Sequence, residues 1–152
     1  MHWVFEPFDK LTNLQVYTLL QLRSRVFVVE QACVFLDMDG LDEACHHLLG
    51  YKGSALAASA RILPPGLAYP GYASIGRVVT APEARGEGAG RALMQQAIAQ
   101  LYELYGQVPI KIGAQQYLER FYQSFGFVQS GPMYLEDGIP HIPMVLGKVA
   151  DL

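Results

Sequence analysis

Three stretches of the chain carry apolar residues at the spacing of an amphipathic helix. This spacing predicts helices over residues 13–30, 88–105 and 116–125. The expected buried faces consist of Leu19, Leu22, Val26 and Val29 in the first helix, Met94, Ile98, Leu101 and Tyr105 in the second, and Leu118, Phe121, Tyr122 and Phe125 in the third. Thr12 or Asn13 can cap the first helix, and Gly126 suits a left-handed cap after the third.

Shorter apolar runs bounded by turn residues predict β-strands. The expected strands cover residues 47–52, 56–63, 74–80, 109–113, 127–134 and 141–146. Gly53-Ser54 is a hairpin turn signal between the first two strands, and the proline-rich segment 64–71 indicates a surface loop. Alternation along the 74–80 strand places Ile75 and Val79 on one face, with Gly76 and Val78 on the other.

These elements predict one α/β domain over residues 1–152, with more strands than helices. A net charge of -3 without a basic patch disfavours nucleic-acid binding. No apolar run approaches about 18 residues, so no membrane span is expected. The start, Met1-His2-Trp3, lacks the cationic and apolar stretches of a signal peptide. Two cysteines without an export signal predict a reduced, cytoplasmic protein.

A glycine-rich turn lies between the 74–80 strand and the second helix. The run Arg85-Gly86-Glu87-Gly88-Ala89-Gly90 has glycine at alternate positions, so its backbone can approach a ligand closely. The helix that follows offers free N–H groups and the positive end of its dipole to an anion. Arg85 and Arg91 add positive charge beside this turn.

Three ligands, or none, could explain such a turn. An ATP-binding P-loop needs Lys-Ser/Thr after its glycines, and that pair is missing. A Rossmann dinucleotide turn needs Gly-x-Gly-x-x-Gly, but the third glycine position is occupied by Arg91 or Leu93. A coenzyme A pyrophosphate and a purely structural turn remain.

Residues 78–93 resemble the acetyl-coenzyme A motif of GNAT N-acetyltransferases, in which a strand and a Pro-Glu turn precede Arg/Gln-x-x-Gly-x-Gly/Ala at the start of a helix. Arg85, Gly88 and Gly90 occupy its defined positions. Residues 121–127 (FYQSFGF) resemble the Phe-Tyr-x-x-x-Gly-Phe ending of the second family motif, in the family order and spacing. Similarity to the ElaA-type subfamily extends over residues 22–31, 39–42, 46–50, 60–63 and 136–141.

The resemblance implies the GNAT fold and acetyl-coenzyme A as cosubstrate. That fold is a twisted, mixed but mostly antiparallel sheet of about six or seven strands, flanked by helices and splayed between the 74–80 and 109–113 strands. The implied cofactor contacts are the backbone of Val78, Val79 and Thr80 with the pantetheine arm, the N–H groups of Gly86, Glu87, Gly88, Ala89, Gly90 and Arg91 with the pyrophosphate, and the Arg85 charge beside them. Gln115 stands where many relatives carry a cofactor-binding asparagine.

Acyl transfer to an amine needs a donor for the oxyanion, an acid for the leaving thiolate and an uncharged amine. The resemblance assigns the oxyanion to a backbone N–H near Val79 and the acid to Tyr122, although the apolar stripe alone would place Tyr122 in the core. The candidates for the base are Glu30, His47, His141 and Glu136, or a water relayed by one of them. His46 and His47 would point to opposite faces of a strand, so at most one enters a given pocket.

The segment from Cys33 to Cys45 is acidic and aperiodic, which predicts a solvated loop. Asp39 and Asp42 in it could attract a cationic substrate, and two arginines, Arg23 and Arg61, could bind a carboxylate or pair with these acids. The two cysteines raise two further alternatives, an acyl-cysteine intermediate and a metal site shared with His46 and His47. Neither has Cys-x-x-Cys spacing or a second ligand pair, so we expect no metal.

Together these observations predict a cytoplasmic, acetyl-coenzyme A-dependent N-acetyltransferase. It would act by direct transfer on a primary amine of a small molecule or a peptide. A non-catalytic acyl-CoA-binding or sensing module on the same fold is the alternative. A third alternative, an interaction protein that has lost the cofactor, is disfavoured by the intact glycines at positions 86, 88 and 90. The sequence leaves open the acceptor and the oligomeric state, a homodimer included.

Overall fold

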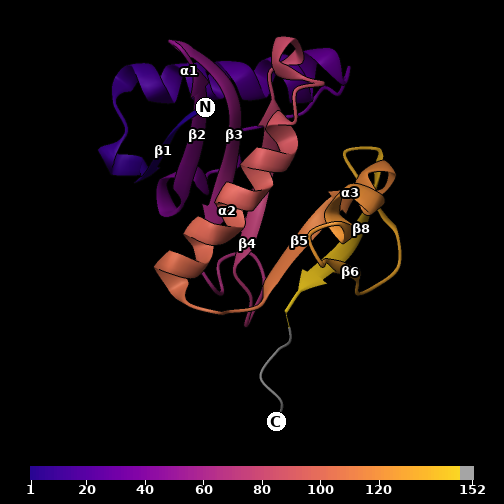
Figure 1. The fold of residues 1–152 in the computed structure, drawn as a ribbon. Coiled ribbons are helices and arrows are strands. Elements are labelled where there is room, and N and C mark those ends of the chain that lie inside the picture. The colour runs from indigo at the N-terminus through magenta and orange to yellow at the C-terminus, as the bar shows by residue number, and fades with distance from the viewer. Residues whose placement is uncertain (148–152) are drawn as a thin grey trace.

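Two four-stranded antiparallel sheets form the framework of the computed structural model, which describes residues 1–147 (Figure 1). The first sheet consists, in spatial order, of β1 (His2–Pro7), β2 (His46–Lys52), β3 (Ala55–Leu63) and β4 (Ser74–Thr80). The second consists of β5 (Ile110–Gln115), β8 (Ile139–Leu146) and β6 (Val128–Gln129), and β7 (Tyr134–Glu136) also pairs with β8. The predicted mixed α/β fold with mostly antiparallel strands is confirmed.

The described residues form eight strands where six or seven were expected, for two reasons. The pattern does not predict β1, because this edge strand is partly exposed on both faces and lacks a clean alternation. The strand expected over residues 127–134 is divided into β6 and β7. Gly131-Pro132 lies between them, and proline has no N–H to donate to a ladder.

Helices cover both faces of the first sheet, α2 in front and α1 behind (Figure 1). The helix α1 (Asn13–Arg23) continues directly into a π-helical segment, Ser24–Glu30, while α2 (Ala89–Tyr105) is a single long helix. The short α3 (Glu119–Gln123) follows a 3-10 turn, Gln116–Leu118, and packs against β5. Further 3-10 turns are Phe8–Lys10, Asp42–Ala44 and Pro82–Ala84.

The first helix begins at Thr12 with a capping box, as the sequence suggests. The Gln15 N–H donates to the Thr12 hydroxyl at 3.1 Å, and the Thr12 N–H donates to the Gln15 side chain at 2.8 Å. One predicted core position is wrong: Val29 is 74% exposed, although Val26 is buried. Hydrogen bonds in a π-helix span five residues, so the apolar period of an ordinary helix no longer predicts the buried face there.

A bulge in β4 overturns the prediction that Ile75 and Val79 share a face. Ile75 packs in the main core under α2, whereas Val79 packs in a second cluster with Leu22 and Val26 of the first helix. The register shifts between these positions, and Arg77 adopts a φ of 49°. An extra residue in one strand reverses the alternation beyond it, so the two ends of β4 present opposite sides to α2.

The two sheets meet at one point and then separate. Ala73 forms a parallel bridge with Ile110, in which the Ala73 N–H donates to the Pro109 carbonyl at 3.1 Å and the Lys111 N–H donates to the Ala73 carbonyl at 2.9 Å. Beyond this bridge β4 and β5 diverge, as Figure 1 shows. The splay that the family resemblance implies is therefore present.

Candidate functional site

A cavity of about 630 Å³ lies where β4 and β5 separate. One wall is β4 from Gly76 to Thr80, and the opposite wall is the second sheet, where Gln115 of β5 stands directly across from His141 of β8. The π-helical segment and α3 close the remaining sides, through residues that include Glu30 and Tyr122. The volume suits a small-molecule ligand.

The bulge gives the β4 wall its open backbone. Ser59 pairs with Val79 and Arg61 pairs with Gly76, so the ladder skips Arg77 and Val78, both of which line the cavity. A backbone outside the ladder has unpaired hydrogen-bonding groups for a ligand. All three predicted pantetheine contacts line the cavity. Val78 lies in the skipped stretch, whereas Val79 and Thr80 pair with β3 and are open only on the side toward β5, where β4 is an edge strand.

The glycine-rich turn begins at the rim of this cavity. Gly86 and Gly88 have φ angles of 83° and 78°, which favour glycine, and a side chain at either position would meet open space. Gly88 caps α2, and the first helical hydrogen bond runs from the Ala92 N–H to the Gly88 carbonyl at 3.0 Å. The N–H groups of residues 89–91 therefore lie before the helical ladder and are open to an anion.

Only the two ends of the predicted pyrophosphate turn, Arg85 and Gly90, line the cavity itself. The residues between these two ends do not line the cavity, and neither does Arg91. The intervening residues are Gly86, Glu87, Gly88 and Ala89. Glu87 forms an ion pair with Lys52 at the end of β2. The turn is therefore held to the first sheet through a side chain, while its backbone stays accessible.

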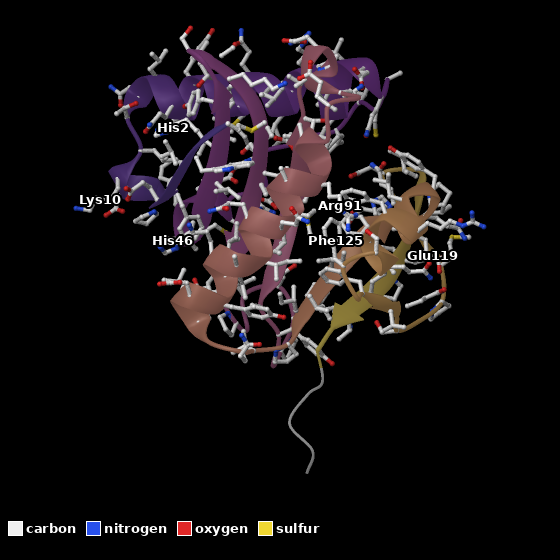
Figure 2. The ribbon with its side chains drawn as sticks, viewed as in Figure 1. His2, Lys10, His46, Arg91, Glu119 and Phe125 are labelled. Atoms are coloured by element: carbon white, nitrogen blue, oxygen red, sulfur yellow. The ribbon has the colours of Figure 1, made fainter. Side chains whose placement is uncertain are left out.

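The two arginines of the turn have different surroundings. The Arg85 guanidinium pairs with Glu30 at 2.7 Å and donates to the Thr80 carbonyl at 3.3 Å. Arg91 donates to the Ser124 hydroxyl at 2.9 Å and lies over the Phe125 ring, 4.9 Å from its centroid; Figure 2 shows the two residues side by side. Arg85 thus stays at the cavity, together with the predicted base Glu30, whereas Arg91 joins α2 to the end of α3.

Tyr122 is both a core residue and a cavity residue. It is 7% exposed and packs edge-on against Phe121 and Phe127, with centroid distances of 5.1 and 6.0 Å. Burial raises the pKa of its hydroxyl to about 12, because the phenolate would be poorly solvated. Tyr122 therefore carries its proton at neutral pH, as an acid for a thiolate must.

His141 and Glu136, two of the predicted bases, meet at the second sheet's end of the cavity. His141 Nδ1 lies 2.7 Å from the Ile139 carbonyl, and Nε2 lies 3.4 Å from a Glu136 carboxylate oxygen. The imidazole also stacks on Tyr134, with centroids 5.8 Å apart. A carbonyl can only accept a hydrogen bond, so Nδ1 carries a proton and Nε2 is the nitrogen that can take one up.

The structure does not bring His47 to the cavity. This residue is fully buried, its Nε2 lies 2.9 Å from the Asp42 carbonyl, and its ring meets Phe8 edge-on. Burial lowers its pKa, which favours the neutral form. The neighbouring His46 stacks on Phe5 instead, on the side of the first sheet away from α3 (Figure 2).

Three of the four acids in the 33–45 segment are paired with arginines, which corrects the prediction of a solvated loop and confirms the alternative that Arg23 and Arg61 pair with acids of this segment. Three arginines meet three aspartates there: Arg23 contacts Asp37 (2.8 Å) and Asp42 (2.7 Å), Arg61 contacts Asp39 (2.8 Å) and Asp42 (3.2 Å), and Arg77 contacts Asp37 (2.9 Å) and Asp39 (3.5 Å). Burial alone would raise the pKa of Asp42, but Arg23 and Arg61 outweigh it and lower the pKa. Hydrogen bonding to Arg61 holds the pKa of Asp39 far below its usual range.

The two cysteines are separate free thiols. Cys33 donates to the Asp137 carbonyl at 3.3 Å and lines the cavity, whereas Cys45 donates to the Leu41 carbonyl at 3.2 Å. Burial raises the pKa of Cys45 to about 11, so it is a poor nucleophile at neutral pH. Within residues 1–147, no group of three His, Cys, Asp or Glu side chains could hold a metal ion.

Several cavity residues were missed by the sequence interpretation. Gln31 accepts a hydrogen bond of 3.4 Å from Gln115, across the cavity between the π-helical segment and β5. Tyr69 and Tyr134 line the cavity, and a Cβ at Gly113 would collide with the Tyr134 hydroxyl. Gly113 inside a strand is the one available signal, since a strand glycine often marks a close approach.

The profile of the family described as "Acetyltransferase (GNAT) domain" matches residues 29–148, most of the chain. The chain belongs to the GNAT acetyltransferase family. Among the relatives of this GNAT protein, Escherichia coli ElaA is 42% identical over 95% of each chain. A UPF0039 protein of Synechocystis is 39% identical over 95% of this chain and 94% of its own. These relatives confirm the ElaA-type resemblance.

Solved structures give the same result for this GNAT domain. An acyl-CoA N-acyltransferase from Pseudomonas aeruginosa is similar with a TM-score of 0.91 and 39% identity, covering 97% of this chain and 100% of the other. Escherichia coli ElaA gives a TM-score of 0.89 at 40% identity, covering 96% and 99%. An aminoglycoside 6'-N-acetyltransferase complexed with coenzyme A shares the fold at 14% identity, with a TM-score of 0.69 over 93% and 95%. In the described part of the chain, the helices are too short or too polar to cross a bilayer.

Proposed function

We propose that this GNAT protein transfers an acetyl group from acetyl-coenzyme A directly to a primary amine. The observation that carries the proposal is the cavity between β4 and β5, which joins an open strand backbone, a helix entry at Gly90 and the protonated Tyr122. These are the parts that a thioester donor requires: a backbone to pair with its amide arm, an anion site for its pyrophosphate and an acid near its sulfur.

Coenzyme A as the acyl carrier is further supported by the fold. Two solved structures of the same fold are complexes with coenzyme A, the aminoglycoside acetyltransferase and PaiA N-acetyltransferase from Thermoplasma acidophilum. In the present chain, Val78, Val79 and Thr80 would pair with the pantetheine arm, and the N–H groups from Gly86 to Arg91 would receive the pyrophosphate. The Arg85 guanidinium at the rim adds a positive charge for the phosphates.

The acyl-transfer chemistry divides between two groups. A backbone N–H near Val79, beside the bulge at which Arg77 and Val78 leave the ladder, would donate to the oxyanion that forms on the acyl carbon. Tyr122 would give its proton to the departing thiolate. A non-catalytic binding module needs no such acid, which favours an enzyme. We place the reaction in the cytoplasm, because both thiols of the chain are free.

The test is thiol release from acetyl-coenzyme A, measured with the purified protein against a library of primary amines. Without a cysteine placed as an acyl carrier, both substrates must be bound together, so initial-rate plots at several fixed amine concentrations should intersect. Parallel lines, or an acetyl group isolated on Cys33, would overturn direct transfer. Tight binding of acetyl-coenzyme A without turnover of any amine would favour the binding module instead.

A further inference from the structure

The second sheet's end of the cavity holds a group of side chains that the donor does not need. Tyr134 and Glu136 come from β7, His141 comes from the facing strand β8, and Tyr69 comes from the loop before β4. Tyr134 stands directly opposite His141 in the β7–β8 ladder and stacks on its ring. Its β7 and β8 members are held in fixed register, and the whole group faces the same cavity as Tyr122.

The charges at this end favour a cation. The three arginines of the cavity wall are engaged: Arg61 and Arg77 with aspartates, and Arg85 with Glu30. Among residues 1–147, no lysine or arginine pairs with the carboxylates of Glu136 or Asp137, which also line the wall. An ammonium group would find the carboxylates of Glu136 and Asp137 here. A carboxylate would find no unengaged arginine or lysine among the lining residues, because Lys111 lies outside them, over the Tyr69 ring at 5.0 Å from its centroid.

The tautomer of His141 gives this end a base. Its Nδ1 proton is held by the Ile139 carbonyl at 2.7 Å, which leaves the Nε2 lone pair as the proton acceptor. Nε2 faces Glu136 at 3.4 Å, so a proton that arrives there creates an imidazolium beside a carboxylate. Other titratable groups that share this part of the cavity are Tyr69, Tyr134, Asp137, Cys33 and Glu30.

We infer that the Tyr134–Glu136–His141 end of the cavity is the acceptor subsite and that His141 Nε2 is the base. The subsite would take a small cationic primary amine whose molecule carries no carboxylate. This inference rests on the proposed acyl transfer and names its substrate class. Tyr69 and Tyr134 would border the ammonium, and Gly113 permits the close approach of the Tyr134 hydroxyl.

The transfer is balanced in protons and bonds. The ammonium gives one proton to His141 Nε2, which passes it to solvent. The free amine forms the new N–C bond at the acyl carbon, and the C–S bond breaks. The thiolate takes the Tyr122 proton, and the second proton of the amine nitrogen restores the Tyr122 hydroxyl. The products are the amide, the free thiol and one released proton.

The acceptor class is tested with matched substrates and the unmodified protein. 1,5-Diaminopentane and lysine differ by one carboxylate, and lysinamide restores the size of lysine without its charge. We expect kcat/KM at least about tenfold higher for the diamine than for lysine, with lysinamide close to the diamine. Equal or better turnover of lysine would overturn the acceptor class. Slow turnover of lysinamide would overturn it too, because the preference would then depend on substrate size and not on charge.

The base is tested with His141→Asn, whose amide N–H can still donate toward the Ile139 carbonyl. At neutral pH, kcat/KM for the diamine should fall by about 10²–10⁴-fold. Part of this loss should disappear near pH 10, where a sizeable fraction of an amine with a pKa of about 10.4 enters uncharged.

His46→Asn is the matched control, since His46 stacks on Phe5 outside the cavity, and it should keep the wild-type rate and pH profile. Melting curves and acetyl-coenzyme A affinity verify that each variant is folded; if His141→Asn is not, His141→Gln takes its place. A folded His141 variant with the wild-type rate and pH profile would overturn the inference while the acyl transfer stands. If the wild-type protein releases no thiol with any amine, the proposed function itself fails.

Discussion

Tyr122 is a core residue that we also propose as the acid of the reaction. Its ring belongs to the main core, between Phe121 and Phe127, while its side chain also lines the cavity. Burial keeps the hydroxyl protonated by raising its pKa to about 12. A core position thereby fixes the direction of the hydroxyl, because a packed aromatic ring has few alternative rotamers.

The change Tyr122→Phe keeps the ring and removes the hydroxyl. We expect kcat for the best amine to fall by about 10²–10⁴-fold, because the thiolate loses its acid. Acetyl-coenzyme A affinity and the melting temperature should stay close to the wild-type values. Steady-state and single-turnover rates are the measurements, since product release could mask a change in the chemical step.

Tyr102→Phe is the control for this change. Tyr102 lies on α2, partly buried against the same core but outside the cavity lining, so its variant should keep full activity. A folded Tyr122→Phe protein with wild-type single-turnover rates would remove Tyr122 from the mechanism.

At the scale of elements, the site is made by three irregularities. The β4 bulge opens a strand backbone, the π-helical segment brings Glu30 and Gln31 over the cavity, and the left-handed Gly86 and Gly88 aim the start of α2. Two ion pairs hold the π-helical segment to the turn, Arg25 with Glu83 and Glu30 with Arg85, both at 2.7 Å. Both pairs are solvent-exposed, so they position the π-helical segment more than they stabilise the fold.

We expect acetyl-coenzyme A binding to be most sensitive to a charge added at the start of α2. Gly88→Glu places a carboxylate beside the expected pyrophosphate, and titration calorimetry should show a large loss of acetyl-coenzyme A affinity. Gly88→Ala is the matched control, because alanine meets the same unfavourable φ of 78° without adding a charge. The difference between the two variants measures the charge alone, and equal affinities would reject this site.

At the scale of the whole molecule, the arginine–aspartate cluster joins parts that are distant in sequence. Arg23 ends α1, Arg61 lies in β3, Arg77 lies in the β4 bulge, and their partners all come from the 33–45 segment. Arg23 is 1% exposed, so its charge depends on these partners. The cluster thereby couples the stability of the fold to the shape of the cavity wall at Arg77.

We predict that Asp42→Ala destabilises the protein by about 3 kcal/mol at pH 7, at the low end for breaking a buried ion pair because Arg23 keeps Asp37. The folded-state pKa of Asp42 is lowered, so its contribution is present above the unfolded pKa of about 4 and is lost as the pH falls through the folded value. Urea denaturation at pH 7, 5 and 3 should therefore show the gap between the two proteins closing below about pH 4.

The neighbouring exposed residue supplies the control for Asp42. Glu43→Ala should change the free energy of unfolding by less than about 0.5 kcal/mol at every pH. A gap between wild type and Asp42→Ala that stays constant from pH 7 to pH 3 would show that lost packing, and not the ion pairs, causes the destabilisation.

Much of this protein could be predicted from its sequence, because the decisive signals are local. The apolar period predicted the three helices and most strands, and Thr12 marked the start of the first helix. Gly126 adopts the predicted left-handed conformation, but α3 already ends at Gln123, short of the predicted residue 125. The glycines after Arg85 predicted a turn open to an anion, since glycine alone accepts such angles cheaply. The family motifs added the predicted cofactor contacts and the prediction that Tyr122 is the acid.

The remainder depended on pairings that no local pattern contains. The β4 bulge arises from the register with β3, and the π-helical turn hides Val26 but exposes Val29. Burial of the 33–45 acids required arginines from three separate elements, which only the folded chain brings together. The same holds for the candidate bases. The sequence ranked His47 with His141, whereas tertiary packing buries His47 against Phe8 and the Asp42 carbonyl and places His141 at the cavity beside Glu136.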